Sequence, residues 1–556
     1  MRTNPLLLTD GYKLGHKSET PDGTTLTFSN LTPRGSRIGT DFSMFFGLQY
    51  AVKEYLIDRF NEDFFNRPKD EVMQEINATI TSYLGPGFDT SHFAALHDLG
   101  YLPIRIKALP EGSKVPLRVP VLTIHNTHPD FFWLTNYLET LLSSLLWMPS
   151  TSLTISYLYR KTFDEFAKKT GNEDFVDFQG HDFSFRGMSS PESAIVSGMA
   201  FLTCFKGTDC VPALNGLVKY YGADFSDSIG HSVPATEHAL ACLYTAIKDE
   251  YSYFEELITK IHPAGIVSLV SDTYDYWGVL TEFLPKLKDQ IMARDGKVVI
   301  RPDSGNPVDI ICGKNVFEIE SLGDIFIDPP EEGEVFIFNG ATYSLNREEY
   351  DELVHDHGKE SVYDIFHREI KDGDVEELLY QNIITEASMP THEVKGSIEI
   401  LWELFGGTVN EKGYKELDPH IGLIYGEAIT PDRQKEIFER LEAKGFASTN
   451  VVLGLGSYGF QYKTRDSLGW AIKGTWAINN GKEYALFKDP ATDDGTKKSA
   501  RGLVRVDGNN GNYTYTDQVS WEEQEKGALE EVFVDGKLTR DTTLEQVRAT
   551  VKSSLY

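Results

Sequence analysis

Carboxylate side chains follow two apolar runs that the sequence predicts to be buried strands. Residues 266–270 lead to Asp272 and Asp275, and residues 298–300 lead to Asp303. Acidic residues at the ends of parallel strands can hold Mg²⁺ through water and can orient substrate hydroxyls. A lone Asp after a strand is, however, more often a helix N-cap. Both interpretations stay open for each of these three residues.

A glycine-rich loop follows a third apolar run, residues 451–453. Gly454, Gly456 and Gly459 have the spacing of the dinucleotide fingerprint, which makes a nicotinamide-dependent dehydrogenase one candidate. The polar and basic residues after the loop argue against it, because that fingerprint needs an apolar helix and a second strand. Glycine lets backbone N–H groups approach an anion, and basic residues follow at Lys463, Arg465 and Lys473. A phosphate-binding loop fits better, with a solvated basic surface as the alternative.

Two other segments combine aromatic, basic and imidazole groups. Phe183 lies three residues before Arg186, which suits stacking a flat heterocycle and pairing a phosphate. Taken alone, that pattern is weak. His238 could be a nucleophile or a base, although a lone His beside a helix start is more often structural.

Strands, polar loops and helices alternate through the middle of the chain. The clearest helix is predicted over 431–444, with Thr430 as N-cap, Pro431 in the first turn and Gly445 as the stop. This order is typical of a parallel sheet or barrel, whose chemistry gathers at the carboxyl ends of the strands. We therefore expect an α/β fold in which residues 151–470 form an irregular β/α barrel with the catalytic site.

The two ends of the chain predict a different element. Residues 502–517 and 532–538 show the alternation of short antiparallel strands, the second with an Asp-Gly turn. Thr542 and Glu545 have the spacing of a capping box before a final helix. Residues 1–150 and 471–556 are expected to form a second, α+β domain.

Residues 313–398 interrupt the barrel pattern. Residues 334–343 alternate like a hairpin, and an acidic helical pattern starts at Arg347. Residues 321–380 hold 17 acidic and 4 basic side chains, a net charge of 4 − 17 = −13, which indicates a solvated surface element. We interpret this stretch as an insertion on a barrel loop, and an integral βα unit is the alternative.

Composition and charge exclude several classes of protein. The 556 residues carry 53 Lys and Arg against 84 Asp and Glu, a net charge of −31, so non-specific binding to nucleic acid or to anionic membranes is not expected. The apolar fraction of 40% is that of a folded globular chain and excludes a polytopic membrane protein. Four cysteines without a C-x-x-C pair, and no apolar leader, predict a cytoplasmic protein.

An ordered set of segments resembles the nicotinate and nicotinamide phosphoribosyltransferase family, which has the type II phosphoribosyltransferase fold. The most distinctive are His-Asp-Phe-Ser-Phe-Arg-Gly at 181–187, Ser-Val-Pro-Ala-Thr-Glu-His at 232–238 and Arg-Pro-Asp-Ser-Gly-Asn-Pro at 301–307. The other matching segments are 8–13, 46–50, 102–112, 133–140, 205–209, 271–275, 464–466 and 487–490. Together they span nearly the whole chain.

The resemblance implies transfer of phosphoribosyl from phosphoribosyl diphosphate to nicotinamide for NAD salvage. It also implies Mg²⁺, ATP hydrolysis that stimulates the reaction through a phosphohistidine, and a homodimer with shared active sites. His238 would accept the phosphate, and Asp272 and Glu237 would orient its ring. Nicotinate as the acceptor is the nearest alternative, and a dehydrogenase or a non-catalytic binding protein is more remote.

The resemblance also assigns the substrate-binding residues. The pyridine ring would lie between Phe183 and the partner subunit's Tyr12, and Arg301 would flank it. Asp209 would accept a hydrogen bond from the amide NH₂ and would repel the carboxylate of nicotinate. Asp303 would serve the ribose and, through water, the metal. Glu427 would bind ribose where the family usually has Asp, and Ser457 stands where a further Gly is usual. The phosphate and diphosphate ligands would be Arg34, Arg186, Gly456, Ser457, Arg465, Lys473 and Lys488.

Overall fold

The computed structural model describes residues 3–319, 322, 324–327, 329–330, 334–358, 361, 375–387, 391–426, 428–492 and 497–555. The chain divides into two compact units. Unit 1 comprises Met1–Lys161, Gly180–Ser232 and Gly456–Tyr556, and unit 2 comprises Thr162–Gln179 and Val233–Leu455. In the described ranges no helix is both long and apolar enough to cross a lipid bilayer.

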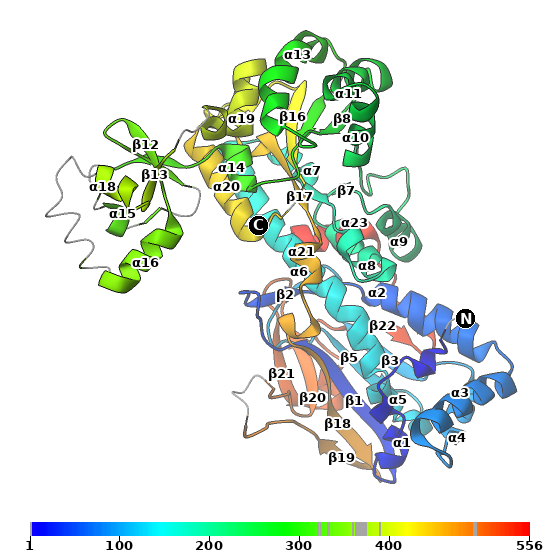
Figure 1. The fold of residues 1–556 in the computed structure, drawn as a ribbon. Helices are drawn as coiled ribbons and strands as arrows, with labels where there is room; N and C mark the ends of the chain where they lie inside the picture. The colour runs from blue at the N-terminus through cyan, green and yellow to red at the C-terminus, as the bar shows by residue number, and fades with distance from the viewer. Residues whose placement is uncertain are drawn as a thin grey trace. The chain divides into compact units, whose positions relative to one another are not determined.

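Unit 1 contains a seven-stranded antiparallel sheet whose strands come from both ends of the chain (Figure 1). Its order is β19-β18-β1-β5-β3-β22-β23. The strands are β1 (Thr24–Pro33), β3 (Ile104–Ala108), β5 (Leu122–Asn126), β18 (Trp470–Asn479), β19 (Lys482–Ala485), β22 (Glu530–Val534) and β23 (Lys537–Leu538). The predicted strands near 502–517 are β20 (Leu503–Asp507) and β21 (Thr514–Val519), which pair with each other.

Unit 1 also contains helices from several parts of the chain. They include α2 (Leu48–Tyr50), α3 (Lys69–Leu84), α4 (Ser91–Leu99), α5 (Leu134–Tyr137), α8 (Pro191–Phe201), α9 (Val211–Tyr221), α21 (Ser457–Gln461), α22 (Trp521–Gln524) and α23 (Leu544–Lys552). The 32-residue helix α6 (Glu139–Thr170) belongs to both units. The capping box of the last helix lies one residue later than predicted, because Thr543 caps α23 and pairs with Gln546.

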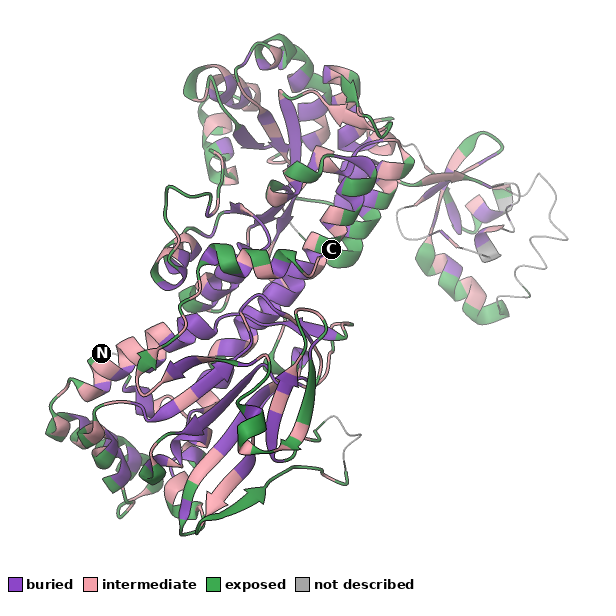
Figure 2. Cartoon of the chain, turned by 180° about the vertical axis from the view of Figure 1, so that it is seen from behind, coloured by how far each residue is buried: buried purple, intermediate pink, exposed green. Residues whose placement is uncertain are grey.

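Unit 2 is built on parallel strands, which confirms the α/β class. In the order β17-β16-β9-β8, the curled sheet contains β17 (Val451–Leu455), β16 (Ile421–Tyr425), β9 (Val298–Arg301) and β8 (Val267–Val270). Helices flank it, among them α10 (His238–Ile247), α11 (Glu250–Glu256), α13 (Leu284–Met292), α14 (Pro307–Cys312), α19 (Thr391–Phe405) and α20 (Pro431–Ala443) (Figure 1). The strands are buried and the outer helix faces are exposed (Figure 2). Thr430 caps α20 through the amide of Arg433, as predicted.

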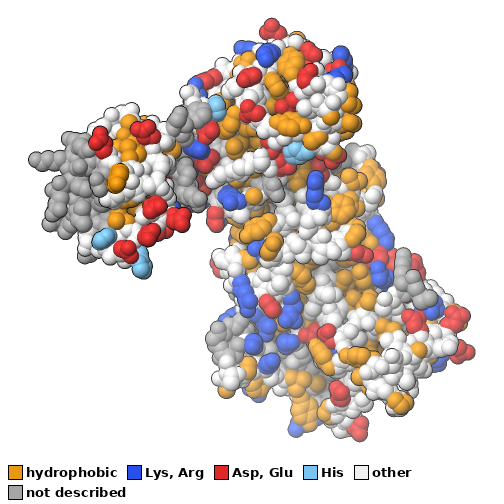
Figure 3. All heavy atoms as spheres, in the orientation of Figure 1, with side chains coloured by type: hydrophobic (Ala, Val, Ile, Leu, Met, Phe, Trp, Pro, Cys, Tyr) orange, Lys and Arg blue, Asp and Glu red, His pale blue; other side chains and the backbone are white. Residues whose placement is uncertain are grey.

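The described residues between 316 and 386 form a small module with a core of its own. Its sheet has the order β10-β11-β12-β13, with β10 (Val316–Glu318), β11 (Val335–Phe338), β12 (Ala341–Leu345) and β13 (Ile384–Glu386). Helices α15 (Asp324–Ile327), α16 (Arg347–His357) and α18 (Val375–Tyr380) accompany it. The predicted hairpin and acidic helix are therefore confirmed, and acidic side chains are prominent on its visible face (Figure 3).

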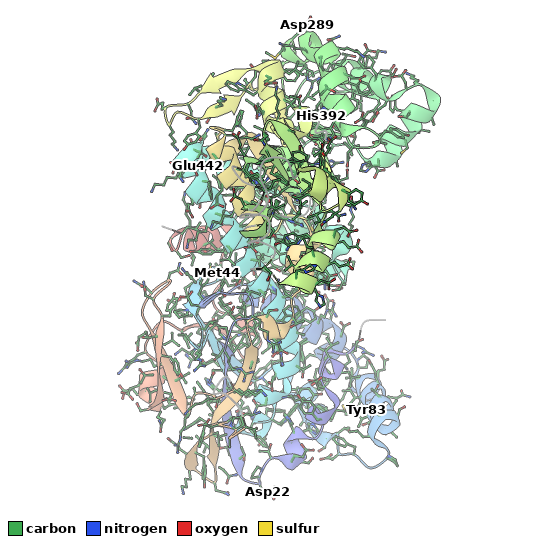
Figure 4. The ribbon with its side chains drawn as sticks, turned by 60° about the vertical axis from the view of Figure 1, so that its left-hand side comes forward. Asp22, Met44, Tyr83, Asp289, His392 and Glu442 are labelled. Atoms are coloured by element: carbon green, nitrogen blue, oxygen red, sulfur yellow. The ribbon has the colours of Figure 1, made fainter. Side chains whose placement is uncertain are left out.

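The module begins and ends at two glycines that touch, which we call the neck. A Cβ on Gly396 would lie 2.1 Å from the Gly313 nitrogen, and Gly396 has a φ of 75° that L side chains rarely adopt. The Lys314 amide donates to the Glu393 carbonyl at 2.8 Å. The ring of His392 (Figure 4) lies 5.1 Å from that of Trp277 in the barrel. The chain therefore enters and leaves the module at a single point.

Candidate active site

His238 and Asp272 form a hydrogen-bonded pair in unit 2. His238 is the first residue of α10, and its Nε2 lies 3.1 Å from Oδ1 of Asp272, just after β8. The Asp272 side chain is 3% exposed and the His238 side chain 45%. A carboxylate only accepts, so Nε2 donates, and the neutral ring then has its lone pair on Nδ1. The arrangement presents a nucleophilic nitrogen to the surface and keeps a buried negative charge behind it.

The second oxygen of Asp272 fixes the next strand end. Oδ2 accepts the backbone N–H of Asp303 at 3.0 Å, so one carboxylate connects the loops after β8 and β9. Gly426, at the end of β16, makes room for the Asp303 side chain, because a Cβ there would lie 2.5 Å from its Oδ1. Asp272 and Asp303 are therefore neighbours in the structure, at the ends of adjacent strands.

Among the described residues, Asp275 and Glu237, also predicted for this site, make no contact with His238 like that of Asp272. Asp275 is an N-cap, whose Oδ1 accepts the Gly278 amide at 3.0 Å. Glu237 is the N-cap residue of α10 but makes no side-chain capping hydrogen bond. Its side-chain contacts in the described part of the chain include no hydrogen bond to His238. Glu427, expected at the ribose, lies outside the described residues.

Arg301 is held from one side only. One of its terminal nitrogens donates to the Thr236 carbonyl, and its buried Nε has no hydrogen-bond partner among the residues that the structure describes. Thr236 is in turn fixed, since its Oγ1 accepts the Val270 amide at 3.0 Å. The guanidinium therefore retains donor capacity for a ligand. Sequence analysis assigned no role to Thr236, although it lies in the same motif as His238.

Phe183 and Asp209 come together in unit 1 at the ends of the parallel strands β6 (Gly180–Asp182) and β7 (Gly207–Thr208). The ring of Phe183 lies 4.6 Å from that of His181. His181 and Ser232 both hydrogen-bond Oδ1 of Asp209 at 2.8 Å. Neither was assigned a role from the sequence, although each begins a motif quoted above. An aromatic face thus lies beside an oriented carboxylate.

Arg186 lies next to the glycine-rich loop. It belongs to the 3-10 turn Phe185–Gly187, and a Cβ on Gly187 would lie 2.0 Å from Oγ of Ser457, at the start of α21. The Ser189 amide also donates to the Gln461 side chain of that helix at 2.8 Å. Arg186 and Ser457, with Gly456 as the N-cap, are therefore grouped as a phosphate site requires.

A second basic group in unit 1 surrounds Glu139. Lys13 and Lys473 lie 2.6 and 3.2 Å from its two oxygens, and although burial opposes it, these lysines hold the pKa of Glu139 below its ordinary value. Tyr12, 67% exposed, is next to this group, and partial burial and the Asp10 carboxylate raise its pKa. Its ring contacts are with His16 and Lys13.

The remaining predicted phosphate ligands are spread over unit 1. Arg34 donates from Nε to the Gly469 carbonyl at 3.2 Å, Arg465 pairs with its neighbour Asp466, and Lys488 is exposed. As for metals, the described residues include no group of three or more His, Cys, Asp or Glu side chains arranged to hold an ion. Asp272 and Asp303, linked through the Asp303 backbone amide, supply two carboxylate groups at neighbouring strand ends.

Comparison with known proteins identifies the family. A sequence model of the nicotinate phosphoribosyltransferase (NAPRTase) family matches residues 178–329 and 348–537. This chain belongs to that family. A sequence model of the nicotinamide phosphoribosyltransferase N-terminal domain also matches, over residues 4–106.

Two curated relatives of the family align over nearly their whole length. Nicotinamide phosphoribosyltransferase of Acinetobacter baylyi is 42% identical over 100% of this chain and 98% of its own. That of Xanthomonas campestris is 31% identical over 98% and 97%. The crystal structure of human nicotinic acid phosphoribosyltransferase superposes with a TM-score of 0.48 at 15% identity, covering 98% of this chain and 93% of that one. That similarity is too weak to bear on the choice of acceptor.

Proposed function

We propose that this chain transfers a phosphoribosyl group from phosphoribosyl diphosphate to nicotinamide, giving nicotinamide mononucleotide and diphosphate for NAD salvage. The names of the full-length relatives support this reaction. The observation that carries the choice of acceptor is the oriented carboxylate of Asp209 beside the Phe183 ring. An amide NH₂ donates to a carboxylate, whereas the carboxylate of nicotinate would be repelled by it.

The reaction needs positioning more than covalent help. The uncharged pyridine nitrogen attacks C1 of the ribose, the C1–O bond to diphosphate breaks, and its electron pair leaves with the diphosphate. Arg186, Ser457 and Gly456 would bind the 5′-phosphate. The cations Arg34, Arg465, Lys473 and Lys488 would stabilise the charge that develops on the leaving group.

Mg²⁺ fits this site only as a partner of the substrate. Magnesium commonly uses one or two carboxylates, several waters and substrate phosphates, and Asp303 next to Asp272 offers that minimal set. When bound, it would neutralise charge on the leaving diphosphate. Asp303 would hold it through water and hydrogen-bond the ribose hydroxyls, with Glu427 as a second ribose ligand.

His238 is proposed as the residue that couples ATP to the reaction. Nδ1 attacks the γ-phosphorus, the bond to the bridging oxygen breaks and ADP leaves, so that the ring becomes a positively charged phosphoimidazole. Because the Nε2–H group stays hydrogen-bonded to the Asp272 carboxylate, the positive charge of the ring develops next to the buried negative charge of that carboxylate. Water then releases phosphate and restores the neutral ring. One ATP and one water would thus be converted to ADP and phosphate in each such cycle, although no atom of ATP enters nicotinamide mononucleotide.

A homodimer with shared active sites is proposed as the working form. Leu240, Leu243 and Ile247 of α10 are exposed, Ile247 by 70%, on the helix that begins at His238. Such an apolar face is typical of a surface that a second copy covers. Exposed Tyr12 would then reach the pyridine ring of the other protomer. The cytoplasm is the proposed location.

The test is formation of nicotinamide mononucleotide from phosphoribosyl diphosphate and Mg²⁺, with nicotinamide and nicotinate compared in parallel, with and without ATP. Product from nicotinamide, increased by ATP, is the expected result. Product from nicotinate alone would overturn the role of Asp209. No product from either acceptor would overturn the activity itself.

A further inference from the structure

The backbone that bears Asp209 is rigidly placed by the two short parallel strands. His181 is in register with Gly207, and Asp182 with Thr208, so Asp209 is the first residue beyond the paired segment. Its own amide donates to the Asp182 carbonyl at 3.0 Å. Residue 209 therefore leaves the strand at a fixed position, and its side-chain torsions decide where the carboxylate points.

The side chains of His181 and Ser232 act on those torsions. His181 Nε2 and Ser232 Oγ each lie 2.8 Å from the same oxygen, Oδ1 of Asp209. Because a carboxylate has no proton to give, both must donate, which assigns the Nε2–H tautomer to a neutral His181. Two donors from different segments that converge on one oxygen restrict rotation about the carboxylate bond.

The imidazole is itself held in place. Gly207 packs closely against it: a Cβ at this position would lie 2.9 Å from Nδ1 of His181 and 2.8 Å from the Gly180 carbonyl oxygen. Phe183 covers the ring from another side, with 4.6 Å between ring centroids and a 42° tilt. The His181 side chain is only 11% exposed, whereas that of Asp209 is 43% exposed. A largely buried donor thus orients a carboxylate that is accessible to a ligand.

We propose that His181 and Ser232 are positioning residues that set acceptor selectivity, by holding the Asp209 carboxylate in the orientation that reads an amide. This rests on the proposed function, in which Asp209 binds the NH₂ of nicotinamide. The two hydrogen bonds also fix where the negative charge that would repel nicotinate lies. Loss of either donor weakens the hold on that orientation, and with it both the attraction and the repulsion.

The experiment compares four single variants of the full-length enzyme. His181→Leu and Ser232→Ala each remove one donor, and His181→Gln restores an N–H near the position of Nε2. Ser228→Ala is the matched control, because it removes a serine–histidine hydrogen bond in the same loop, Oγ to His231 Nε2 at 2.8 Å, without touching Asp209. The readouts are KM and kcat for nicotinamide and for nicotinate, together with Tm.

His181→Leu is expected to raise KM for nicotinamide about tenfold, as loss of one charge-assisted hydrogen bond predicts, with a smaller change in kcat. The ratio of kcat/KM for nicotinamide to that for nicotinate should fall. His181→Gln should recover most of both losses, and Ser228→Ala should behave as the wild type. Ser232→Ala should change selectivity in the same direction as His181→Leu.

A double-mutant cycle with Asp209→Ala separates positioning from a general structural role. If His181 acts through Asp209, His181→Leu will have little further effect on KM in the Asp209→Ala background. Equal effects in both backgrounds, or unchanged selectivity in His181→Leu, would overturn the proposal. Absence of product from the wild-type enzyme would instead refute the proposed function, so the two failures are distinguishable.

Discussion

The buried carboxylate of Asp272 accepts hydrogen bonds on both oxygens, from the ring of His238 at 3.1 Å and from the backbone of Asp303 at 3.0 Å. It therefore connects the proposed ATP-coupling residue to the proposed ribose and metal residue. The connection runs between the ends of the neighbouring strands β8 and β9. A substitution at Asp272 therefore changes the surroundings of both His238 and Asp303.

His238→Ala should abolish ATP hydrolysis and leave slow, ATP-independent synthesis of nicotinamide mononucleotide. Asp272→Asn should lower ATP hydrolysis about hundredfold or more, because it removes the charge that stabilises the phosphoimidazole. Asp275→Asn is the control, since that neighbouring carboxylate caps a helix. Steady-state ATPase assays and ³¹P NMR of the trapped phosphoenzyme, with the phosphate expected on Nδ1, check these outcomes. Retained hydrolysis in His238→Ala would assign the phosphate to another acceptor.

Asp209→Asn should relax the preference for nicotinamide. The substitution keeps the size of the side chain but removes the charge that repels nicotinate, so the ratio of the two kcat/KM values is expected to fall about tenfold or more. Asp224→Asn, which alters an exposed carboxylate bonded to Ser226 in the same unit, should leave the ratio unchanged. Unaltered selectivity in paired assays of Asp209→Asn would remove the argument from charge.

His92 makes stability depend on pH. Burial lowers the pKa of His92 to about 4, and neither ring nitrogen has a hydrogen-bond partner among the described residues. Between about pH 6.5 and pH 4 the imidazole is protonated in the unfolded chain but neutral in the folded chain. The free energy of unfolding therefore decreases as pH falls through this range. The loss from this one group is on the order of 3 kcal/mol.

Unfolding by denaturant at pH 7 and pH 4.5 tests this effect. His92→Leu should lose less stability than the wild type between the two pH values. His355→Leu, at a side chain that is 87% exposed, serves as the control. Parallel losses in wild type and His92→Leu would show that the imidazole is not the source.

Gly396→Ala should destabilise the neck of the inserted module. The new Cβ would lie 2.1 Å from the Gly313 nitrogen and residue 396 would have to keep a φ of 75°, so the two backbone segments of the neck must move apart. Gly406→Ala isolates the backbone contribution, because Gly406 has a φ of 76° and nothing within 4 Å of its Cβ. The control should cost ~1–2 kcal/mol and Gly396→Ala clearly more, as measured by thermal unfolding. Equal losses would mean that the neck can adjust.

Removal of residues 314–395 should leave a folded, active enzyme. Gly313 and Gly396 are already in contact, so a direct join or a one- or two-glycine linker can bridge them and leave in place α14 and the part of α19 that follows the kink at Gly396. Nicotinamide mononucleotide synthesis within a few-fold of the wild type is expected, checked with Tm and assays at matched concentration. Inactive or insoluble protein with every linker would show that the module supports the site.

Much of this fold could be predicted from sequence periodicity. Short apolar runs bounded by polar loops located β8, β9 and β17, and the capping residues located α20. Because side chains at the ends of parallel strands converge, the pairing of Asp272 with Asp303 followed from those runs. The choice between ligand and helix cap for Asp275 did not, since the two roles use the same residue type at the same place.

Other contacts depend on distant segments that meet only in the folded chain. The hydrogen bond from Ser232 to Asp209 joins two loops 23 residues apart, and no local pattern marks it. Thr236 could not be assigned, because its role is to present a backbone carbonyl to Arg301, which any residue type can do. The capping box was placed one residue early, since Thr542 and Thr543 both offer a suitable hydroxyl.

The contact of Gly313 with Gly396 also has a consequence for the folding of the chain. Closing a loop costs entropy that grows only with the logarithm of its length, so eighty or so residues between touching ends add little to the cost of closing the barrel. Because the module has its own core, it can melt separately from the barrel, and calorimetry should then resolve two transitions. The same point in the chain would accept a different passenger domain, provided that its termini lie equally close together.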